Sequence, residues 1–259
     1  MLISFDYLFN KYKIAPKGVI HIGASEGQEA AMYYKCGIER SIWIEAIPEI
    51  YERLKLNLQK YSNALAINAC IGDVDGKEVD FNISSNEGQS SSYLKFGTHK
   101  QQHPNVDYID SRKMKTIRID TLLNNRLPVI IKFKSNVSQD DMVKFQEAWE
   151  FAKVSNSPIF TNQDVDILTS QETVHSYPYD FLNIDLQGCE LMALKSMGKY
   201  MNDIKYAYIE VNRDELYQGC AMVNEIDAFM NLYGLERVET KWTGFGWGDA
   251  LYMKSELKN

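Results

Sequence analysis

The sequence predicts an α/β fold, with a mostly parallel seven-stranded sheet that ends in a C-terminal antiparallel hairpin. Short apolar runs alternate with amphipathic helical stretches over most of the chain, and this rhythm is typical of parallel strands joined by helices. The last two extended segments are joined by a glycine-rich turn without a helix, so they must run antiparallel. The segment 127–177 breaks the rhythm, and we expect it to be a small α+β insertion.

The first half of the chain repeats a strand followed by a helix. A lead-in helix over 3–12 ends before Pro16 and Gly18, which interrupt helical structure. A long polar loop, 84–108, separates two additional extended segments, and loops of such length tend to be functional. The predicted strands are 18–23, 41–45, 64–71, 77–84 and 115–120, and the predicted helices are 28–36 and 48–60.

The second half resumes the same rhythm after the insertion. We therefore predict one main domain made of 1–126 and 178–259, interrupted by the inserted segment 127–177. The predicted elements of this half are strands at 181–185 and 206–211, helices at 190–200 and 222–233, and hairpin strands at 235–241 and 250–253.

The composition is that of a soluble globular protein, with 45% hydrophobic and 24% charged residues. A net charge of -7 argues against a broad nucleic-acid surface, which needs clustered Lys and Arg. No apolar run approaches the roughly 18 residues of a membrane span, and the N-terminus does not resemble a signal peptide. We expect a cytoplasmic protein with reduced thiols, because no CxxC pair occurs among Cys36, Cys70, Cys189 and Cys220.

A glycine turn follows the first predicted strand. Gly23 ends that strand, and Gly27 stands at the mouth of the next helix. Glycine lets the backbone approach a ligand closely, and open α/β sheets bind ligands beyond the carboxyl ends of their strands. The pattern is not GxGxxG, so the sequence gives little support to a pyrophosphate site.

Glu45 ends the second predicted strand. A carboxylate at this position can accept hydrogen bonds from both hydroxyls of a ribose. Both S-adenosylmethionine and NAD carry an unphosphorylated ribose, so Glu45 suits either cofactor and disfavours NADP.

Several motifs together resemble the FkbM family of S-adenosylmethionine-dependent methyltransferases. Their order and spacing carry the resemblance, which covers nearly the whole chain except about 127–177. FLNIDLQGCELMALKSM is similar to the signature IDxxGxExxxL of that family. The motifs are VIHIGASEGQ and the residues after it at 19–58, NACIGDVDG at 68–76, SNEGQSSSYL at 85–94, FLNIDLQGCELMALKSM at 181–197 and WGDALYMK at 247–254.

The resemblance implies a Rossmann-like class I methyltransferase fold with S-adenosylmethionine as cofactor and S-adenosylhomocysteine as product. Asp185, at the end of its strand, would face the methyl-transfer centre. Glu45 would hold the ribose hydroxyls, and Asn68 and Ala69 would lie near the adenine. Ala46 is expected to contact the cofactor as well. The expected contacts of the methionine and ribose part are Gly23, Ala24, Ser25 and Gly27.

Transfer of a methyl group to a hydroxyl needs an aligned oxygen and a base that removes its proton. Asp185 and Glu210 end neighbouring strands, and His99 and His103 lie in the long loop; all four are candidate catalytic residues. Glu190 is a further candidate, although its charge also suits the helix N-terminus where it stands. The two histidines could bind a divalent metal together with carboxylates. We favour no metal and assign the loop to acceptor binding.

The sequence thus predicts an O-methyltransferase that acts on a hydroxyl of a sugar, a glycan or a hydroxylated natural product. The expected partner is this small-molecule or glycan acceptor, and the sequence leaves a homo-oligomer open. Two alternatives stay open: an NAD-dependent oxidoreductase, and a non-catalytic binding module that retains the fold.

Overall fold

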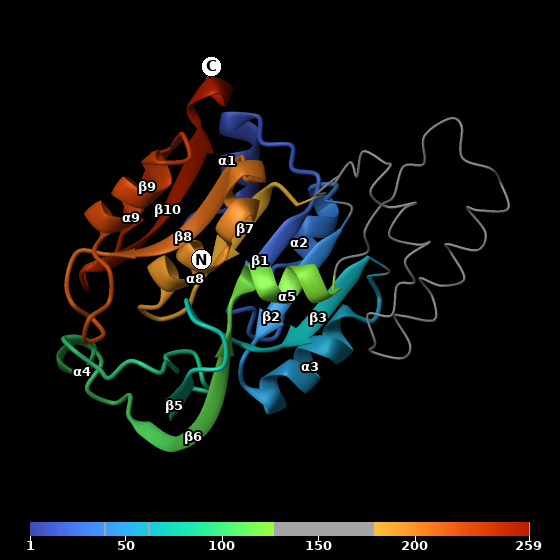
Figure 1. Cartoon of the computed structure of the whole chain (residues 1–259). Helices are drawn as coiled ribbons and strands as arrows, with labels where there is room; N and C mark the ends of the chain where they lie inside the picture. Colours follow the sequence, from blue (N-terminus) through green and yellow to red (C-terminus); the bar gives the residue numbers. More distant parts are fainter. Residues whose placement is uncertain (39, 62, 127–178, 259) are drawn as a thin grey trace, which may run out of the picture. The chain divides into compact units, whose positions relative to one another are not determined.

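The computed structural model describes residues 1–38, 40–61, 63–126 and 179–258 (Figure 1). The predicted insertion at 127–177 lies outside the described residues, so its α+β character and its boundaries remain predictions.

A seven-stranded sheet forms the centre of the described part, in the order β3-β2-β1-β7-β8-β10-β9 (Figure 1). The five strands from β3 to β8 are parallel, whereas β10 pairs antiparallel with both β8 and β9. This confirms the predicted fold class, with its mostly parallel sheet and its closing hairpin. The strands are β1 (Val19–Ile22), β2 (Ser41–Glu45), β3 (Ala64–Asn68), β7 (Phe181–Ile184), β8 (Tyr206–Asn212), β9 (Leu235–Trp242) and β10 (Trp247–Lys254).

The central strands are buried on both faces because helices cover the sheet on each side. Every residue of β1, β2, β7 and β8 is buried, as expected for parallel strands in a doubly covered sheet. One face packs against α1 (Phe5–Tyr12), α2 (Ala30–Lys35) and α3 (Pro48–Leu58). The remaining helices of this core are α5 (Ile119–Arg126), α8 (Glu190–Ser196) and α9 (Val223–Asn231).

Aromatic side chains hold α1 against the sheet. The ring of Phe5 lies 5.2 Å from that of Tyr208 on β8 and 5.7 Å from that of Phe181 on β7. Its centroid is also 5.5 Å from that of Tyr33 on α2. Buried aromatic rings contribute large apolar areas to a core. The lead-in helix predicted from helical spacing is therefore part of the packed domain.

A second, three-stranded sheet carries the long loop. It has the order β4-β6-β5, made of β4 (Cys70–Ile71), β6 (Tyr108–Ile117) and β5 (Glu78–Ser84). The predicted strand 64–71 is thus divided between two sheets. The loop between β5 and β6 contains the short helix α4 (His99–Gln102).

The prediction of a strand at 115–120 is wrong at its C-terminal end, because β6 stops at Ile117 and α5 begins at Ile119. Asp120 favours the helix here: its carboxylate accepts a hydrogen bond from the N–H of Thr121 and pairs with Arg118. Ile119, Leu122 and Leu123 are buried at helical spacing, which fixes the helix against the core.

The second hairpin strand also begins earlier than predicted, at Trp247 rather than Ala250. All four cysteines are free thiols. None of the helices given above has the length and apolar character that a transmembrane span requires.

Candidate active site

A cavity of about 620 Å³ lies at the carboxyl ends of β1, β2, β7 and β8. In the sheet, β1 stands between β2 and β7, so the order of the strands reverses at this point. Open α/β sheets bind ligands at such a point. Ten of the predicted site residues line the cavity: Gly23, Ala24, Ser25, Glu45, Ala46, Ala69, His99, His103, Asp185 and Glu210.

The glycine turn after β1 is held against the neighbouring strands. The N–H groups of Gly23 and Ala24 both donate to the carbonyl oxygen of Ile44 on β2, at 3.0 Å. Gly23 has φ +78°, and a β-carbon there would lie 1.7 Å from the carbonyl oxygen of Asp185. Only glycine fits this position. Gly27 does not line the cavity; a β-carbon there would lie 2.8 Å from the side chain of Leu54 on α3.

Glu45 ends β2 with its carboxylate fixed at the cavity wall. Its Oε2 accepts a hydrogen bond from the N–H of Ser25 at 2.9 Å, and its Oε1 accepts one from the N–H of Ile47 at 2.8 Å. Burial raises the pKa of Glu45 to about 7, although these backbone hydrogen bonds act in the opposite direction. The carboxylate therefore has a fixed orientation and is only 7% exposed.

The end of β3 lies beside Glu45. Ala69 lines the cavity, and its N–H donates to the carbonyl oxygen of Glu45 at 3.1 Å. Asn68 does not line the cavity, and its amide donates to the carbonyl oxygens of Glu45 and Ala46 at 2.9 and 3.0 Å. In this arrangement Asn68 supports the strand end, and its predicted contact with adenine stays a prediction.

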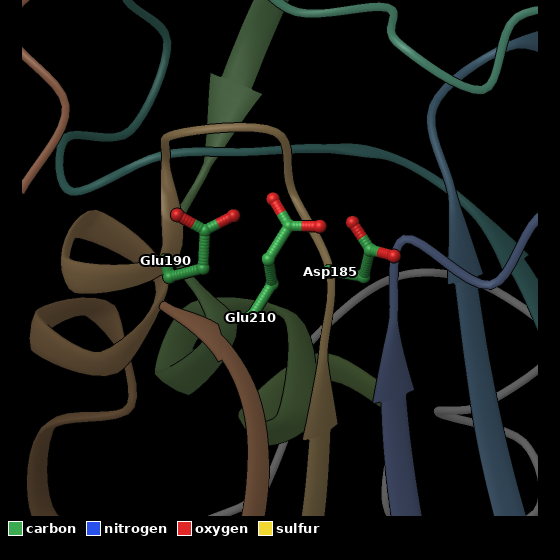
Figure 2. A group of neighbouring side chains, drawn as sticks. All are labelled: Asp185, Glu190 and Glu210. Carbon is green, nitrogen blue, oxygen red and sulfur yellow. The ribbon is translucent and has the colours of Figure 1, made fainter. Parts of the chain in front are cut away.

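Three carboxyl groups gather at the ends of β7 and β8 and the start of α8. One oxygen of each of Asp185, Glu190 and Glu210 lies within 4.8 Å of the others. Figure 2 shows the carboxylate of Glu210 between those of Glu190 and Asp185. Burial raises the pKa of Glu190 to about 7 and that of Glu210 well above its ordinary value. The carboxylate of Asp185 is open to the cavity. Desolvation by the surrounding protein raises its pKa to about 6, although the hydrogen bond from Gln187 acts in the opposite direction.

Glu190, a candidate catalytic residue, does not line the cavity. Its Oε1 accepts hydrogen bonds from the N–H groups of Leu186 and Gly188, at 2.9 and 3.1 Å. It thereby holds the turn that leads into α8, which is the local role that the sequence left open.

Gln187 links the carboxyl groups of Asp185 and Glu210 to Tyr217, and sequence reasoning missed it. Its Nε2 donates to Oδ1 of Asp185 at 2.6 Å and to Oε2 of Glu210 at 3.3 Å. Its Oε1 accepts from the hydroxyl of Tyr217 at 2.6 Å. Gln187 has φ +50°, a left-handed conformation that only the folded turn reveals.

Asp249 on β10 also lines the cavity and was not predicted. It stands opposite Glu210 in the antiparallel pair of β8 and β10. Its Oδ2 accepts a hydrogen bond from the hydroxyl of Tyr208 at 2.6 Å. The signal for this residue was the WGDALYMK motif, read together with the hairpin register.

The two loop histidines lie side by side. Their ring centroids are 4.8 Å apart, and His103 follows directly after α4. Nε2 of the buried His99 lies 3.1 Å from Oγ of Ser90, and burial lowers the pKa of His99 to about 4. Phe96 stacks on His99 at 4.4 Å. The rings of Phe96, His99 and His103 thus pack against one another within the loop.

The aromatic residues of the last hairpin occupy different places. Trp247 lines the cavity. Phe245 is 47% exposed and its ring lies 5.0 Å from that of His103. The guanidinium of Arg213 covers the ring of Trp242 at 4.1 Å, so that face of Trp242 has a partner within the protein.

The chain matches no protein-family model and no curated protein. Among solved structures it is similar to a SAM-dependent methyltransferase from Aquifex aeolicus, with 9% identity, a TM-score of 0.44 and coverage of 98% of this chain and 90% of that one. It is also similar to magnesium protoporphyrin IX methyltransferase from Synechocystis with bound SAM, with 7% identity, a TM-score of 0.45 and coverage of 96% and 76%. A third is TrmK from M. capricolum with S-adenosyl-homocysteine, with 7% identity, a TM-score of 0.41 and coverage of 98% and 70%.

Proposed function

We propose that this protein is an S-adenosylmethionine-dependent O-methyltransferase for a hydroxyl of a sugar, a glycan or a hydroxylated natural product. The observation that carries the proposal is that the carboxylate of Glu45 and the turn at Gly23 meet at one wall of the cavity. The motifs that resemble the FkbM family supply these same residues.

The residues of this wall fit the methyl donor. The carboxylate of Glu45 accepts hydrogen bonds, and a ribose offers two hydroxyl donors. The close turn at Gly23 and Ala24 brings backbone up to the cavity without bulky side chains. Asp185 presents a carboxylate to the same cavity, and its negative charge suits a cationic sulfonium centre and its ammonium group.

The bound donor supplies an electrophilic methyl carbon. This chain has to place an acceptor oxygen in line with that carbon and remove the proton of the oxygen. Asp185 has a carboxylate that is open to the cavity at the end of β7. We assign to this carboxylate the removal of the proton from the acceptor oxygen. Gln187 holds the carboxylate through its hydrogen bond to Oδ1. Gln187 is thus a positioning residue.

The loop after β5 supports a polyhydroxylated acceptor. Asn86, Gln89 and Ser90 line the cavity and offer several donors and acceptors of hydrogen bonds. His103 and Trp247 add ring surfaces to the same cavity. Polar groups beside aromatic rings suit a sugar, which has polar edges and apolar ring faces.

Calorimetric titration of the full chain with S-adenosylhomocysteine and with NAD tests the cofactor. We expect S-adenosylhomocysteine to bind with one site per chain, and Glu45→Gln to weaken it by about 10- to 100-fold, the equivalent of about 1.5–3 kcal/mol for a hydrogen bond to a charged group. Glu52→Gln is the matched control, because Glu52 is an exposed residue of α3. Binding of NAD without S-adenosylhomocysteine would support the oxidoreductase instead.

A screen for transfer of labelled methyl groups over nucleotide sugars, glycans and hydroxylated natural products tests the reaction. We expect a methyl ether product, and we expect Asp185→Asn to lower its rate by about 10²- to 10⁴-fold, the range of general-base catalysis. Asp80→Asn, on the exposed side of β5, is the control. Cofactor binding without transfer to any acceptor class would support a non-catalytic binding module.

A further inference from the structure

The three carboxyl groups of Asp185, Glu190 and Glu210 form a compact cluster of oxygens. One oxygen of each lies within 4.8 Å of the others (Figure 2). They come from three different elements: the end of β7, the start of α8 and the strand β8. Like charges at such separations repel one another strongly unless a proton or a cation lies between them.

Among the three residues, Glu190 gives the strongest indication of a bound ligand. Its side chain is 0% exposed, and its Oε1 is fixed by the two backbone N–H groups of Leu186 and Gly188. Its Oε2 is buried and has no hydrogen-bond partner among the described residues. In Figure 2 one oxygen of Glu190 points toward Glu210. A buried carboxylate oxygen without a partner is costly, so a positive group at this place would offset the cost.

Asp185 and Glu210 each also have one carboxylate oxygen that accepts no hydrogen bond from the described residues. Gln187 contacts Oδ1 of Asp185 and Oε2 of Glu210, and no hydrogen bond reaches their second oxygens. The residues that line the adjoining cavity include Glu29, Glu45 and Asp249 but, within the described ranges, no Lys or Arg. Among the lining residues of the described part, positive charge comes from the amino group of Met1 and from any protonated histidine.

We propose that Asp185, Glu190 and Glu210 bind one divalent cation of the hard class, such as Ca²⁺, Mg²⁺ or Mn²⁺. All three ligands are carboxylate oxygens, which these ions prefer, whereas zinc prefers sites with nitrogen or sulfur. Oxygens on opposite sides of a Ca²⁺ ion lie roughly 5 Å apart, so separations up to 4.8 Å suit one shared ion. The smaller Mg²⁺ requires the three side chains to move slightly closer.

This site departs from the sequence prediction, which favoured no metal and considered the loop histidines as ligands. His99 and His103 take no part in the cluster of three carboxyl groups. Asp185 and Glu210 line the cavity as well, so a cation on the cluster is open to ligand oxygens from that side. Binding of the cation needs no methyl donor, and the inference therefore does not depend on the proposed function.

The test is a titration of the chelator-treated full chain with MnCl₂ at pH 7.5, without methyl donor. Free Mn²⁺ is counted by electron paramagnetic resonance, and the heat of binding by calorimetry. We expect one Mn²⁺ per chain, displaced by Ca²⁺ or Mg²⁺. Glu190→Gln should weaken Mn²⁺ binding at least about tenfold, since even changes outside the ligand shell of a metal cost about 10- to 100-fold.

Glu29→Gln is the matched control, because Glu29 lines the same cavity but lies outside the cluster. It should change the affinity for Mn²⁺ far less than Glu190→Gln does. Glu210→Gln serves as a second ligand variant if Glu190→Gln does not fold. Absence of stoichiometric Mn²⁺ binding, or an equal loss in Glu29→Gln, overturns the site. S-adenosylhomocysteine binding in the same preparation reports on the cofactor separately.

Discussion

The turn residue Gly23 and the carbonyl oxygen of Asp185 are in direct contact across two neighbouring strands. A β-carbon on Gly23 would lie 1.7 Å from that oxygen. The register explains the contact, because Ile22 pairs with Ile184 and the N–H of Asp185 donates to the carbonyl oxygen of Ile22 at 3.0 Å. We assign Gly23 to the cofactor wall and Asp185 to proton removal. One backbone contact therefore connects these two parts of the candidate site.

Gly23→Ala should destabilise the fold strongly. The new β-carbon would meet backbone, which cannot move aside as a flexible side chain can, and φ +78° is itself unfavourable for alanine. We expect the free energy of unfolding to fall by about 3 kcal/mol or more, as for strain combined with overpacking. Urea unfolding followed by circular dichroism measures this change.

Gly37→Ala serves to distinguish the energetic cost of the contact from the cost of a positive φ. Gly37 has a similar φ of +75°, but a β-carbon there would have no atom within 4 Å. We expect it to cost only about 1–2 kcal/mol, the penalty of a left-handed residue. Equal losses for Gly23→Ala and Gly37→Ala would show that the contact with Asp185 carries no energetic weight.

The sheet could be predicted from the sequence because its strands are short apolar runs bounded by turns and helices. The strand at Ser41–Glu45 was predicted with the bounds that the structure has. Helix α5 could not be predicted, because its residues are helical through tertiary contacts rather than through a strong local pattern. The burial of Ile119 and Leu123 against the core decides the outcome there.

The residues of the candidate site were likewise predicted from the sequence only in part. Gly23 and Asp185 follow strands directly and Glu45 is the last residue of one, so strand assignment alone brings them to one edge of the sheet. Asp249 and Gln187 were missed because their places depend on hairpin register and on a turn with positive φ. Short sequence motifs do not report such pairings.

Affinity for S-adenosylhomocysteine should depend on pH through Glu45. The pKa of this carboxyl is raised to about 7, and ribose hydroxyls donate better to the ionised form. If the ionised form binds, affinity should rise roughly tenfold from pH 6 to pH 8. Calorimetry at each pH measures it, and Glu45→Gln should flatten the dependence. A wild-type affinity that stays constant over this range would contradict the role of Glu45.

The stability of the protein without ligands should also depend on Glu45. Its pKa in the folded state, about 7, lies above the ordinary 4.5, so the folded state holds its proton more tightly than the unfolded state. The contribution of this group to stability is complete below about pH 4.5 and is lost as pH rises to about 7. The loss amounts to about 3 kcal/mol.

The comparison of wild type with Glu45→Gln isolates this effect from those of other groups. The unfolding free energy of wild type should fall, relative to that of the variant, between pH 4.5 and pH 7. Chemical unfolding at half-unit steps of pH provides the measurement. Glu52→Gln should give a curve parallel to wild type, because Glu52 is exposed on α3. Parallel curves for wild type and Glu45→Gln would refute the assignment.

His21 should impose the opposite dependence at acid pH. The imidazole is buried on β1, its Nδ1 lies 3.3 Å from the hydroxyl of Tyr33, and its ring lies 4.9 Å from that of Trp43. Burial lowers the pKa of His21 from 6.5 to about 4, although Glu29 at 4.0 Å acts in the other direction.

The unfolded state therefore takes up a proton at His21 before the folded state does, as pH falls from 6.5 toward 4. Stability that is complete above pH 6.5 should be lost over this interval, by about 3 kcal/mol from this group. His21→Gln should lower stability at pH 7, because the contact with Trp43 is lost, yet it should be less sensitive to acid. Unfolding in urea at pH 7 and at pH 4.5 decides the matter, since equal losses in wild type and His21→Gln would mean that the acid sensitivity arises at other groups.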